Sequence, residues 1–201
     1  MLEEIFDISD RAFQLMESIL AAKTLSPGPH TLMSMPVELG SWLQAALEDF
    51  MPQAENYGIH LAFDLPTGPM LVQIDPLMFR RVIDNLISNA LKYTPQGGRI
   101  TVSGKLLGDS IELRISDTGI GIPQGQLPNL LSESWQIRRE GLRGESSHGL
   151  GLSVVQDIVL QHQALLNVES KEGIGTSFII TLPLMPANTF HPSSQPSPVE
   201  A

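Results

Sequence analysis

The chain contains no cysteine, which excludes disulfide bonds and zinc sites built from thiolates. Basic residues are scarce: 12 lysines and arginines stand against 22 aspartates and glutamates, a formal net charge of −10. This balance argues against nucleic acid as a partner, because non-specific binding needs positive charge to displace counterions. No apolar run approaches the roughly 18 residues that span a bilayer, so we expect a cytoplasmic chain, anchored only if a longer protein supplies the anchor.

The chain does have the composition of a folded domain, with 201 residues of which 42% are hydrophobic. Residues 2–23 predict a helix with a narrow apolar stripe, packed either on its own domain or in a coiled coil or bundle. We assign residues 1–25 to that helix, 26–36 to a Pro- and Gly-containing linker, 37–184 to the main domain and 185–201 to a disordered tail.

The main domain mixes helical and strand patterns. Helices are predicted at 37–56, 76–93 and 150–162 from their apolar spacing, the second with Asp75 as N-cap and Pro76 at its first position. Strands are predicted at 59–65, 70–74, 99–107, 110–117, 165–170 and 176–184, with a hairpin turn at Gly108-Asp109. Residues 119–149 lack regular periodicity, and so long a stretch is usually functional or mobile.

The segment 85–95, Asn-Leu-Ile-Ser-Asn-Ala-Leu-Lys-Tyr-Thr-Pro, carries the most chemistry. Asn85, Asn89 and Lys92 share one stripe of the predicted helix, beside its core face. Amide oxygens suit Mg²⁺, which prefers oxygen ligands, and a lysine offers a point charge for phosphate. The stripe therefore predicts a site for a metal-bound phosphate ligand.

Three glycine motifs follow: Asp-Thr-Gly-Ile-Gly at 117–121, Gly-Leu-Gly-Leu at 149–152 and Gly-Ile-Gly-Thr at 173–176. The first follows a strand, where an aspartate can accept a hydrogen bond from an exocyclic amine such as that of adenine. The second opens a helix, whose free N–H groups favour phosphate. Each motif alone is also explained as a turn or helix entry, and a hairpin turn suffices for the third.

Charged side chains in the irregular segment allow two interpretations. Arg138, Arg139 and Arg143 either fold over a triphosphate or form a solvated loop. His148, beside the second glycine motif, is more simply a solvated histidine than a catalytic one.

The order of these motifs resembles the catalytic, ATP-binding domain of bacterial sensor histidine kinases, which belongs to the ATPase superfamily of gyrase, mismatch-repair and heat-shock chaperone ATPases. The resemblance covers residues 37–184. It implies an α+β fold, a two-layer α/β sandwich with three helices on a mixed, mostly antiparallel five-stranded sheet (the Bergerat ATP-binding fold), preceded by a long helix. ATP would lie between the helices and a flexible lid.

The resemblance also implies roles for individual residues. Asn89 would coordinate Mg²⁺ with support from Asn85, and Lys92 would contact phosphate. Asp117 would bond the adenine amine. The remaining nucleotide-binding residues would be Tyr93 beside the nucleotide, Gly119 and Gly121 at the adenine pocket, Gly149, Leu150, Gly151 and Leu152 at the phosphates, and Thr176 on the adenine side.

The implied partners lie outside the chain. The first helix resembles the second helix of a dimerisation and phosphotransfer domain, so we expect a homodimer through it and a response regulator as partner. None of His30, His60, His148, His162 and His191 matches the phosphoacceptor motif, so the γ-phosphate would go to a histidine elsewhere.

Three departures from the family pattern leave alternatives open. Trp135 is the only aromatic residue of the lid segment 130–135, Ser147-His148 precedes Gly149, and His162-Gln163-Ala164 replaces a Gly-Gly turn. The pattern also fits a non-catalytic nucleotide-binding or dimerisation module of the same fold. A serine kinase of the anti-sigma type is a third alternative, which is less consistent with the first helix.

Overall fold

The computed structural model describes residues 32–130, 141–144 and 151–186. Several predictions fall outside these ranges: the helix 2–23, most of the linker, the tail beyond 186, and Trp135, Arg138, Arg139, His148, Gly149 and Leu150. The division of the chain into domains therefore stays a prediction. Within the described part, no helix combines the length and the apolar character needed to cross a membrane.

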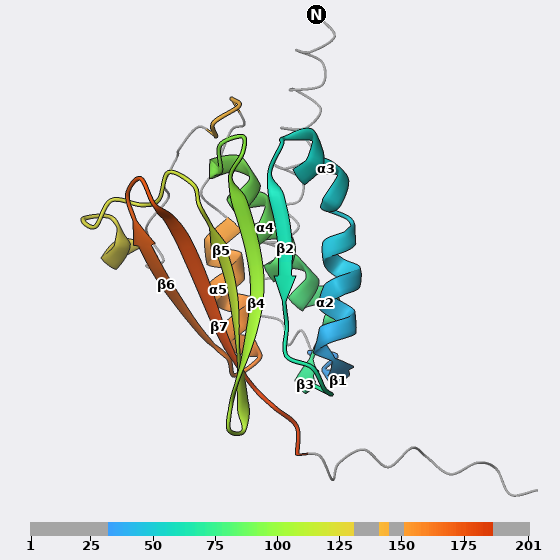
Figure 1. The fold of residues 1–201 in the computed structure, drawn as a ribbon. Helices are drawn as coiled ribbons and strands as arrows, with labels where there is room; N and C mark the ends of the chain where they lie inside the picture. Colours follow the sequence, from blue (N-terminus) through green and yellow to red (C-terminus); the bar gives the residue numbers. More distant parts are fainter. Residues whose placement is uncertain (1–31, 131–140, 145–150, 187–201) are drawn as a thin grey trace, which may run out of the picture.

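A five-stranded sheet forms the centre of the fold, in the order β2-β4-β5-β7-β6 (Figure 1). Strand β2 runs parallel to β4, and the other three pairs are antiparallel. The predicted mixed, mostly antiparallel sheet is thus confirmed, as is the turn at Gly108-Asp109, where Gly108 has φ 64°. The strands are β2 (His60–Asp64), β4 (Arg99–Leu107), β5 (Ser110–Asp117), β6 (Leu165–Lys171) and β7 (Gly175–Pro183).

The start of the main domain differs from its prediction. Residues 37–56 read as one helix, but Met35–Glu38 forms strand β1, which pairs antiparallel with β3 (Leu71–Ile74) in a separate two-stranded sheet. Strand β1 also begins inside the segment 26–36 predicted as a linker. Pairing with a strand more than thirty residues away satisfies the backbone groups of β1, and helical periodicity in the local sequence cannot reveal that partner.

The predicted helix is also divided into two, α2 (Leu39–Glu48) and α3 (Met51–Asn56). It starts after Glu38, whose carboxylate accepts hydrogen bonds from two of the free N–H groups of the first turn, at 3.2 and 2.8 Å. It breaks because Pro52 has no N–H to donate to the carbonyl of Glu48, and its ring would clash with that carbonyl in a continuous helix.

The helices α4 (Pro76–Tyr93) and α5 (Gly151–Gln161) cover one face of the sheet, and α2 lies along the β2 side (Figure 1). The core lies between these layers, where side chains of α4 such as Phe79 and Leu86 are at most 1% exposed. Along β5, alternate residues point to this core, and the intervening polar residues face away from the helices. The predicted two-layer α+β sandwich is confirmed, with α2 and α3 in place of one helix.

His162, directly after α5, joins the two helices of the core. Its side chain is 5% exposed. Its Nε2 accepts a hydrogen bond from the backbone N–H of Asp75 at 2.9 Å, and its Nδ1 lies 2.7 Å from the carbonyl oxygen of Ile158. A carbonyl only accepts, so the proton must sit on Nδ1 and the ring must be neutral for both bonds to form. The histidine is therefore a structural connection between the end of α5 and the start of α4.

The end of α5 explains how the chain does without the Gly-Gly turn. Gln163 adopts a left-handed conformation, with φ 55°, the one positive value at a non-glycine residue of the described part. Its N–H bonds the carbonyl of Leu160 at 2.9 Å, and the N–H of Ala164 bonds that of Val159 at 3.1 Å. This is the Schellman arrangement that ordinarily has glycine at the position of Gln163.

We therefore predict that Gln163→Gly stabilises the protein. Removing the Cβ relieves the steric penalty of the left-handed conformation, which is about 1 kcal/mol for an ordinary residue. The greater freedom of glycine in the unfolded chain offsets part of this gain. Chemical denaturation measures the free energy of unfolding. Gln161→Gly, at an exposed residue in the last turn of the helix, serves as control, since it should destabilise the protein. A destabilised Gln163→Gly protein would contradict the prediction.

Candidate functional site

The helix α4 places the asparagine stripe as predicted. Asp75 caps the helix, because its Oδ1 accepts hydrogen bonds from the backbone N–H groups of Leu77 and Met78 at 3.0 and 3.1 Å. Asn85, Asn89 and Lys92 are all half-buried beside the buried face of the helix. Partial burial fits side chains that are held by the fold but remain accessible to a ligand.

Asn85 connects α4 with the start of α5. Its Nδ2 donates to the carbonyl oxygen of Arg81, one turn earlier, at 2.7 Å. Its Oδ1 faces Gly151 so closely that a Cβ at that glycine would lie 2.5 Å from it. Gly151 therefore lets an amide oxygen approach the first turn of α5, whose N–H groups have no partner within the helix.

The loop after β5 packs against the other end of α4. The N–H of Ile120 donates to the carbonyl oxygen of Tyr93 at 3.1 Å. A Cβ at Gly119 would lie 2.4 Å from that same oxygen, so no other residue fits there without a shift of the backbone. The Tyr93 backbone and the first glycine motif are thus in direct contact.

Asp117 ends β5 and organises the loop that follows. Its Oδ1 accepts two backbone hydrogen bonds, from Gly119 at 2.8 Å and from Thr176 at 3.2 Å. Burial raises the pKa of the Asp117 carboxyl above its ordinary value, and these two hydrogen bonds oppose the rise. Among the described residues, none hydrogen-bonds to its Oδ2, which leaves that oxygen available to a ligand.

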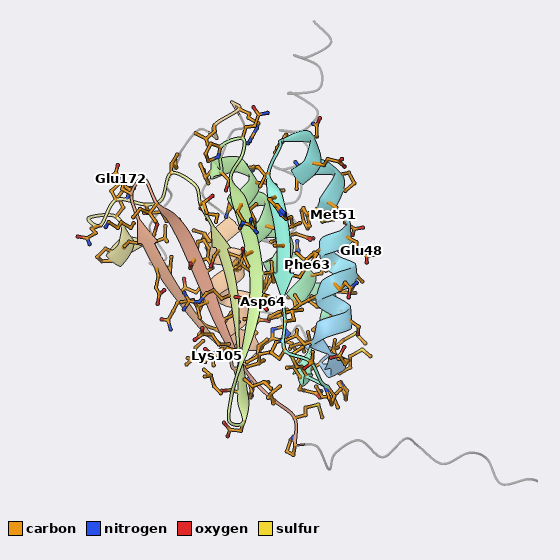
Figure 2. The ribbon with its side chains drawn as sticks, viewed as in Figure 1. Glu48, Met51, Phe63, Asp64, Lys105 and Glu172 are labelled. Carbon is orange, nitrogen blue, oxygen red and sulfur yellow. The ribbon has the colours of Figure 1, made fainter. Side chains whose placement is uncertain are left out.

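The β6–β7 hairpin closes over this loop at two glycines. A Cβ at Gly121, where φ is 65°, would lie 2.1 Å from the carbonyl oxygen of Lys171, and a Cβ at Gly175, where φ is 140°, would lie 2.0 Å from that of Asp117. Figure 2 shows Glu172 at the tip of this hairpin, at the opposite end of the sheet from Lys105. The predicted hairpin turn is confirmed, but it also forms part of the site.

Two residues of the site were not singled out for these positions by the sequence. The Ser170 hydroxyl joins the β6–β7 hairpin to the loop after β5, accepting from the N–H of Ile122 at 2.8 Å. The guanidinium of Arg143 stacks 4.1 Å from the ring centroid of Tyr57 and donates to the carbonyls of Leu91 and Thr94 at 3.0 and 3.1 Å. Arg143 thus binds the end of α4, which neither predicted role describes.

Contacts therefore connect several of the predicted site residues, in two groups. Asn85 meets Gly151, Tyr93 meets Gly119, and Asp117 meets both Gly119 and Thr176. Gly149 and Leu150 lie outside the described residues, and Leu152 packs against the core. Asp117 and its loop therefore meet the end of α4, and Asn85 on the same helix meets the start of α5.

Comparison with known proteins identifies the family of the chain. The family described as histidine kinase-, DNA gyrase B- and HSP90-like ATPase matches residues 74–186, more than half of the chain. The adaptive-response sensory kinase SasA of Synechococcus sp. (strain JA-3-3Ab) is 31% identical over 186 residues, 90% of this chain and 49% of that protein. Histidine protein kinase DivJ of Caulobacter vibrioides is 34% identical over 143 residues, 71% of this chain and 24% of that protein.

Solved structures share the fold. The mycobacterial sensor histidine kinase MprB superimposes with a TM-score of 0.64 at 27% identity, covering 77% of this chain and 99% of that one. Full-length ShkA, solved in complex with AMPPNP, reaches a TM-score of 0.76 at 21% identity over 89% of this chain and 37% of that one. The chain spans about half the length of SasA, the first of these curated relatives. The motifs, the sheet and the family match together show that this chain belongs to the histidine kinase-, DNA gyrase B- and HSP90-like ATPase family.

Proposed function

We propose that this chain is the ATP-binding catalytic portion of a two-component sensor histidine kinase and works in the cytoplasm. It delivers the γ-phosphate of Mg-ATP to a histidine outside the chain. The observation that carries the proposal is the contact of the first glycine motif with both the end of α4 and Asp117. This contact joins an acceptor for a base to the helix that bears the asparagines.

The adenine end of the site is built around Asp117. In the proposal, its free Oδ2 accepts a hydrogen bond from the exocyclic amine of adenine. Gly119 and Gly121 let the loop pack directly against the carbonyl groups of Tyr93 and Lys171, which holds the loop beside the carboxylate in place for the base. Tyr93 flanks the nucleotide, and Thr176, which is 7% exposed, lines the adenine side.

The phosphate end fits a magnesium-bound triphosphate. The Asn85 amide turns its nitrogen to its own helix and its oxygen to the start of α5, which is the orientation a hard cation requires. We assign Mg²⁺ to Asn89 with Asn85 in support, and phosphate to Lys92. The start of α5, with Gly151 and Leu152, offers N–H groups to the phosphates, and we assign Gly149 and Leu150 to the same phosphate site.

The protein's contribution to phosphoryl transfer is positioning and neutralisation of charge, because little covalent chemistry falls to the enzyme in this reaction. When bound, Mg²⁺ supplies charge neutralisation at the phosphates. The chain's own residues hold the nucleotide by its base and orient the phosphates along α4. The histidine that accepts the phosphate would lie in a dimerisation domain of the same protein. The helix 2–23 would form the homodimer. A response regulator would then receive the phosphate from that histidine.

Calorimetric titration with ATP, with and without Mg²⁺, tests the proposal. We expect binding that Mg²⁺ strengthens, and we expect Asn89→Ala to lower the affinity for Mg-ATP about 10–100-fold, as is usual when a group that holds a metal is removed. Binding of ATP without Mg²⁺ should change little. Asn167→Ala, an exposed residue of β6, is the matched control and should bind like the wild type.

Two results would contradict the proposal. Wild-type protein that binds no ATP at millimolar concentration would refute nucleotide binding itself. An Asn89→Ala variant that loses affinity equally with and without Mg²⁺ would refute the metal role. Mixing the chain with a histidine-bearing dimerisation domain and radiolabelled ATP tests transfer, since binding without transfer would leave only a non-catalytic module.

A further inference from the structure

The Ser170 hydroxyl lies at the centre of three contacts. The backbone N–H of Ile122 approaches it at 2.8 Å, the carbonyl oxygen of Gly175 at 2.9 Å and Oγ1 of Thr176 at 2.9 Å. These partners come from the loop after β5 and from the first residues of β7. A single hydroxyl therefore connects two segments that border the proposed adenine site.

Counting protons fixes the direction of each hydrogen bond. A serine hydroxyl has one hydrogen to donate and two lone pairs to accept with. The N–H of Ile122 can only donate, and the carbonyl of Gly175 can only accept. All three contacts become hydrogen bonds only if Ser170 donates to Gly175 and the hydroxyl of Thr176 donates to Ser170. The proton of Thr176 is then engaged, and only its lone pairs remain for another partner.

Thr176 is hydrogen-bonded through its backbone to a residue that carries a second acceptor. The backbone N–H of Thr176 donates to Oδ1 of Asp117, which links the two residues directly. An ionised Asp117 is also acceptor-only, so this side of the site offers two acceptors and no side-chain donor. The two hydrogens of a 6-amino group can each meet one of these acceptors, whereas the carbonyl oxygen of a 6-oxo group would face them without a donor.

We propose that Ser170 is a specificity-determining positioning residue: by taking the proton of Thr176 it keeps that hydroxyl an acceptor and makes the site select 6-amino purines over 6-oxo purines. This inference rests on the proposed function, because it needs a purine nucleotide at Asp117. Ser170 acts through Thr176 and does not contact the base. Without Ser170, the Thr176 hydroxyl can rotate and donate to a 6-oxo group.

The test compares the affinities for ATP and inosine triphosphate, which differ by amine against carbonyl at that position. We expect Ser170→Ala to lower the ratio of ATP to inosine triphosphate affinity about five- to tenfold, the effect of gaining or losing one hydrogen bond. In a Thr176→Val background, Ser170→Ala should leave the ratio unchanged. Ser177→Ala is the matched control, since that hydroxyl pairs with Ser116 at 2.9 Å on the other face of the sheet and should not affect the ratio.

A second pair of variants separates the effect on the orientation of the Thr176 hydroxyl from a general loosening of the loop. Ser170→Thr and Ser170→Val have nearly the same shape, but only the first retains a hydroxyl. We expect the threonine variant to keep the wild-type ratio and the valine variant to lose selectivity. Equal losses for both nucleotides in the alanine and valine variants, or a persistent effect of Ser170→Ala beside Thr176→Val, would overturn the inference alone. Wild-type protein that binds neither nucleotide would overturn the proposed function and the inference with it.

Discussion

Gly121→Ala should destabilise the protein by about 2–5 kcal/mol, because the change combines a clash in a packed region with an unfavourable backbone conformation. The new Cβ would lie 2.1 Å from the carbonyl oxygen of Lys171 and 3.0 Å from Cα of Glu172, both backbone atoms that cannot rotate away. Gly121 also has φ 65°, where a side chain is strained in any surroundings. The hairpin would have to move away from the loop after β5, and nucleotide binding should be lost with it.

Two other glycines serve as controls for Gly121→Ala. Gly173 has φ 75° but no atom within 4 Å of an added Cβ, so Gly173→Ala isolates the backbone penalty, about 1–2 kcal/mol. Gly125 has open space and no positive φ, so Gly125→Ala should be nearly neutral. Chemical denaturation measures the free energy of unfolding of the three variants, which should be lowest for Gly121→Ala and highest for Gly125→Ala. Equal stability of Gly121→Ala and Gly173→Ala would show that the hairpin contact contributes nothing.

Asp117→Asn should lower the affinity for ATP about 10–100-fold, the usual effect of replacing a charged acceptor in a buried hydrogen bond. The asparagine oxygen can still accept from Gly119 and Thr176, so the loop should keep its shape. The second oxygen, however, becomes an NH₂ group that would face the donor of the base. Asp109→Asn removes the same charge in the β4–β5 turn and should bind ATP like the wild type. An unchanged affinity in Asp117→Asn would exclude the carboxylate from base recognition.

The pH dependence of the same variant separates binding from stability. Burial raises the pKa of the Asp117 carboxyl above its ordinary value of 3.8, so the stability that this residue contributes is greatest at low pH and is lost as the pH rises from 3.8 through the higher folded pKa. The Asp117→Asn protein does not lose this stability as the pH rises. The difference between its melting temperature and that of the wild type should therefore shift in favour of the variant over that pH range. ATP binding by the wild type should show the opposite trend, weakening on acidification, because it needs the ionised form.

The sequence predicted those parts of the fold whose signals are local. Asp75 and Pro76 mark the start of α4, and the hydrophobic spacing that follows places Asn85, Asn89 and Lys92 on one stripe. Alternating residues defined β4 and β5, and the glycine motif after β5 marked the site. Each of these signals needs only neighbours along the chain, because capping, periodicity and turn formation are short-range effects.

The sequence could not predict contacts that depend on the pairing of distant segments. Nothing near Val37 signals that Met35–Glu38 pairs with β3, and nothing near Arg143 signals that its guanidinium stacks on Tyr57. The sequence indicates that Gly175 is a hairpin glycine. It does not show that a side chain there would clash with the carbonyl oxygen of Asp117. These contacts exist only once the sheet has its strand order and register.

The sequence by itself determined the chemical groups of the site and their order: an amide stripe, a carboxylate after a strand, and glycines where the backbone must turn. Only the tertiary structure decided how those groups face one another, because β5 and β7 must pair before the N–H of Thr176 can reach Asp117, 59 residues earlier. The pairing of β6 with β7 likewise brings the Ser170 hydroxyl to 2.9 Å from Oγ1 of Thr176. Residue types specify which hydrogen bonds are possible, and the long-range packing of the sheet selects the ones that form.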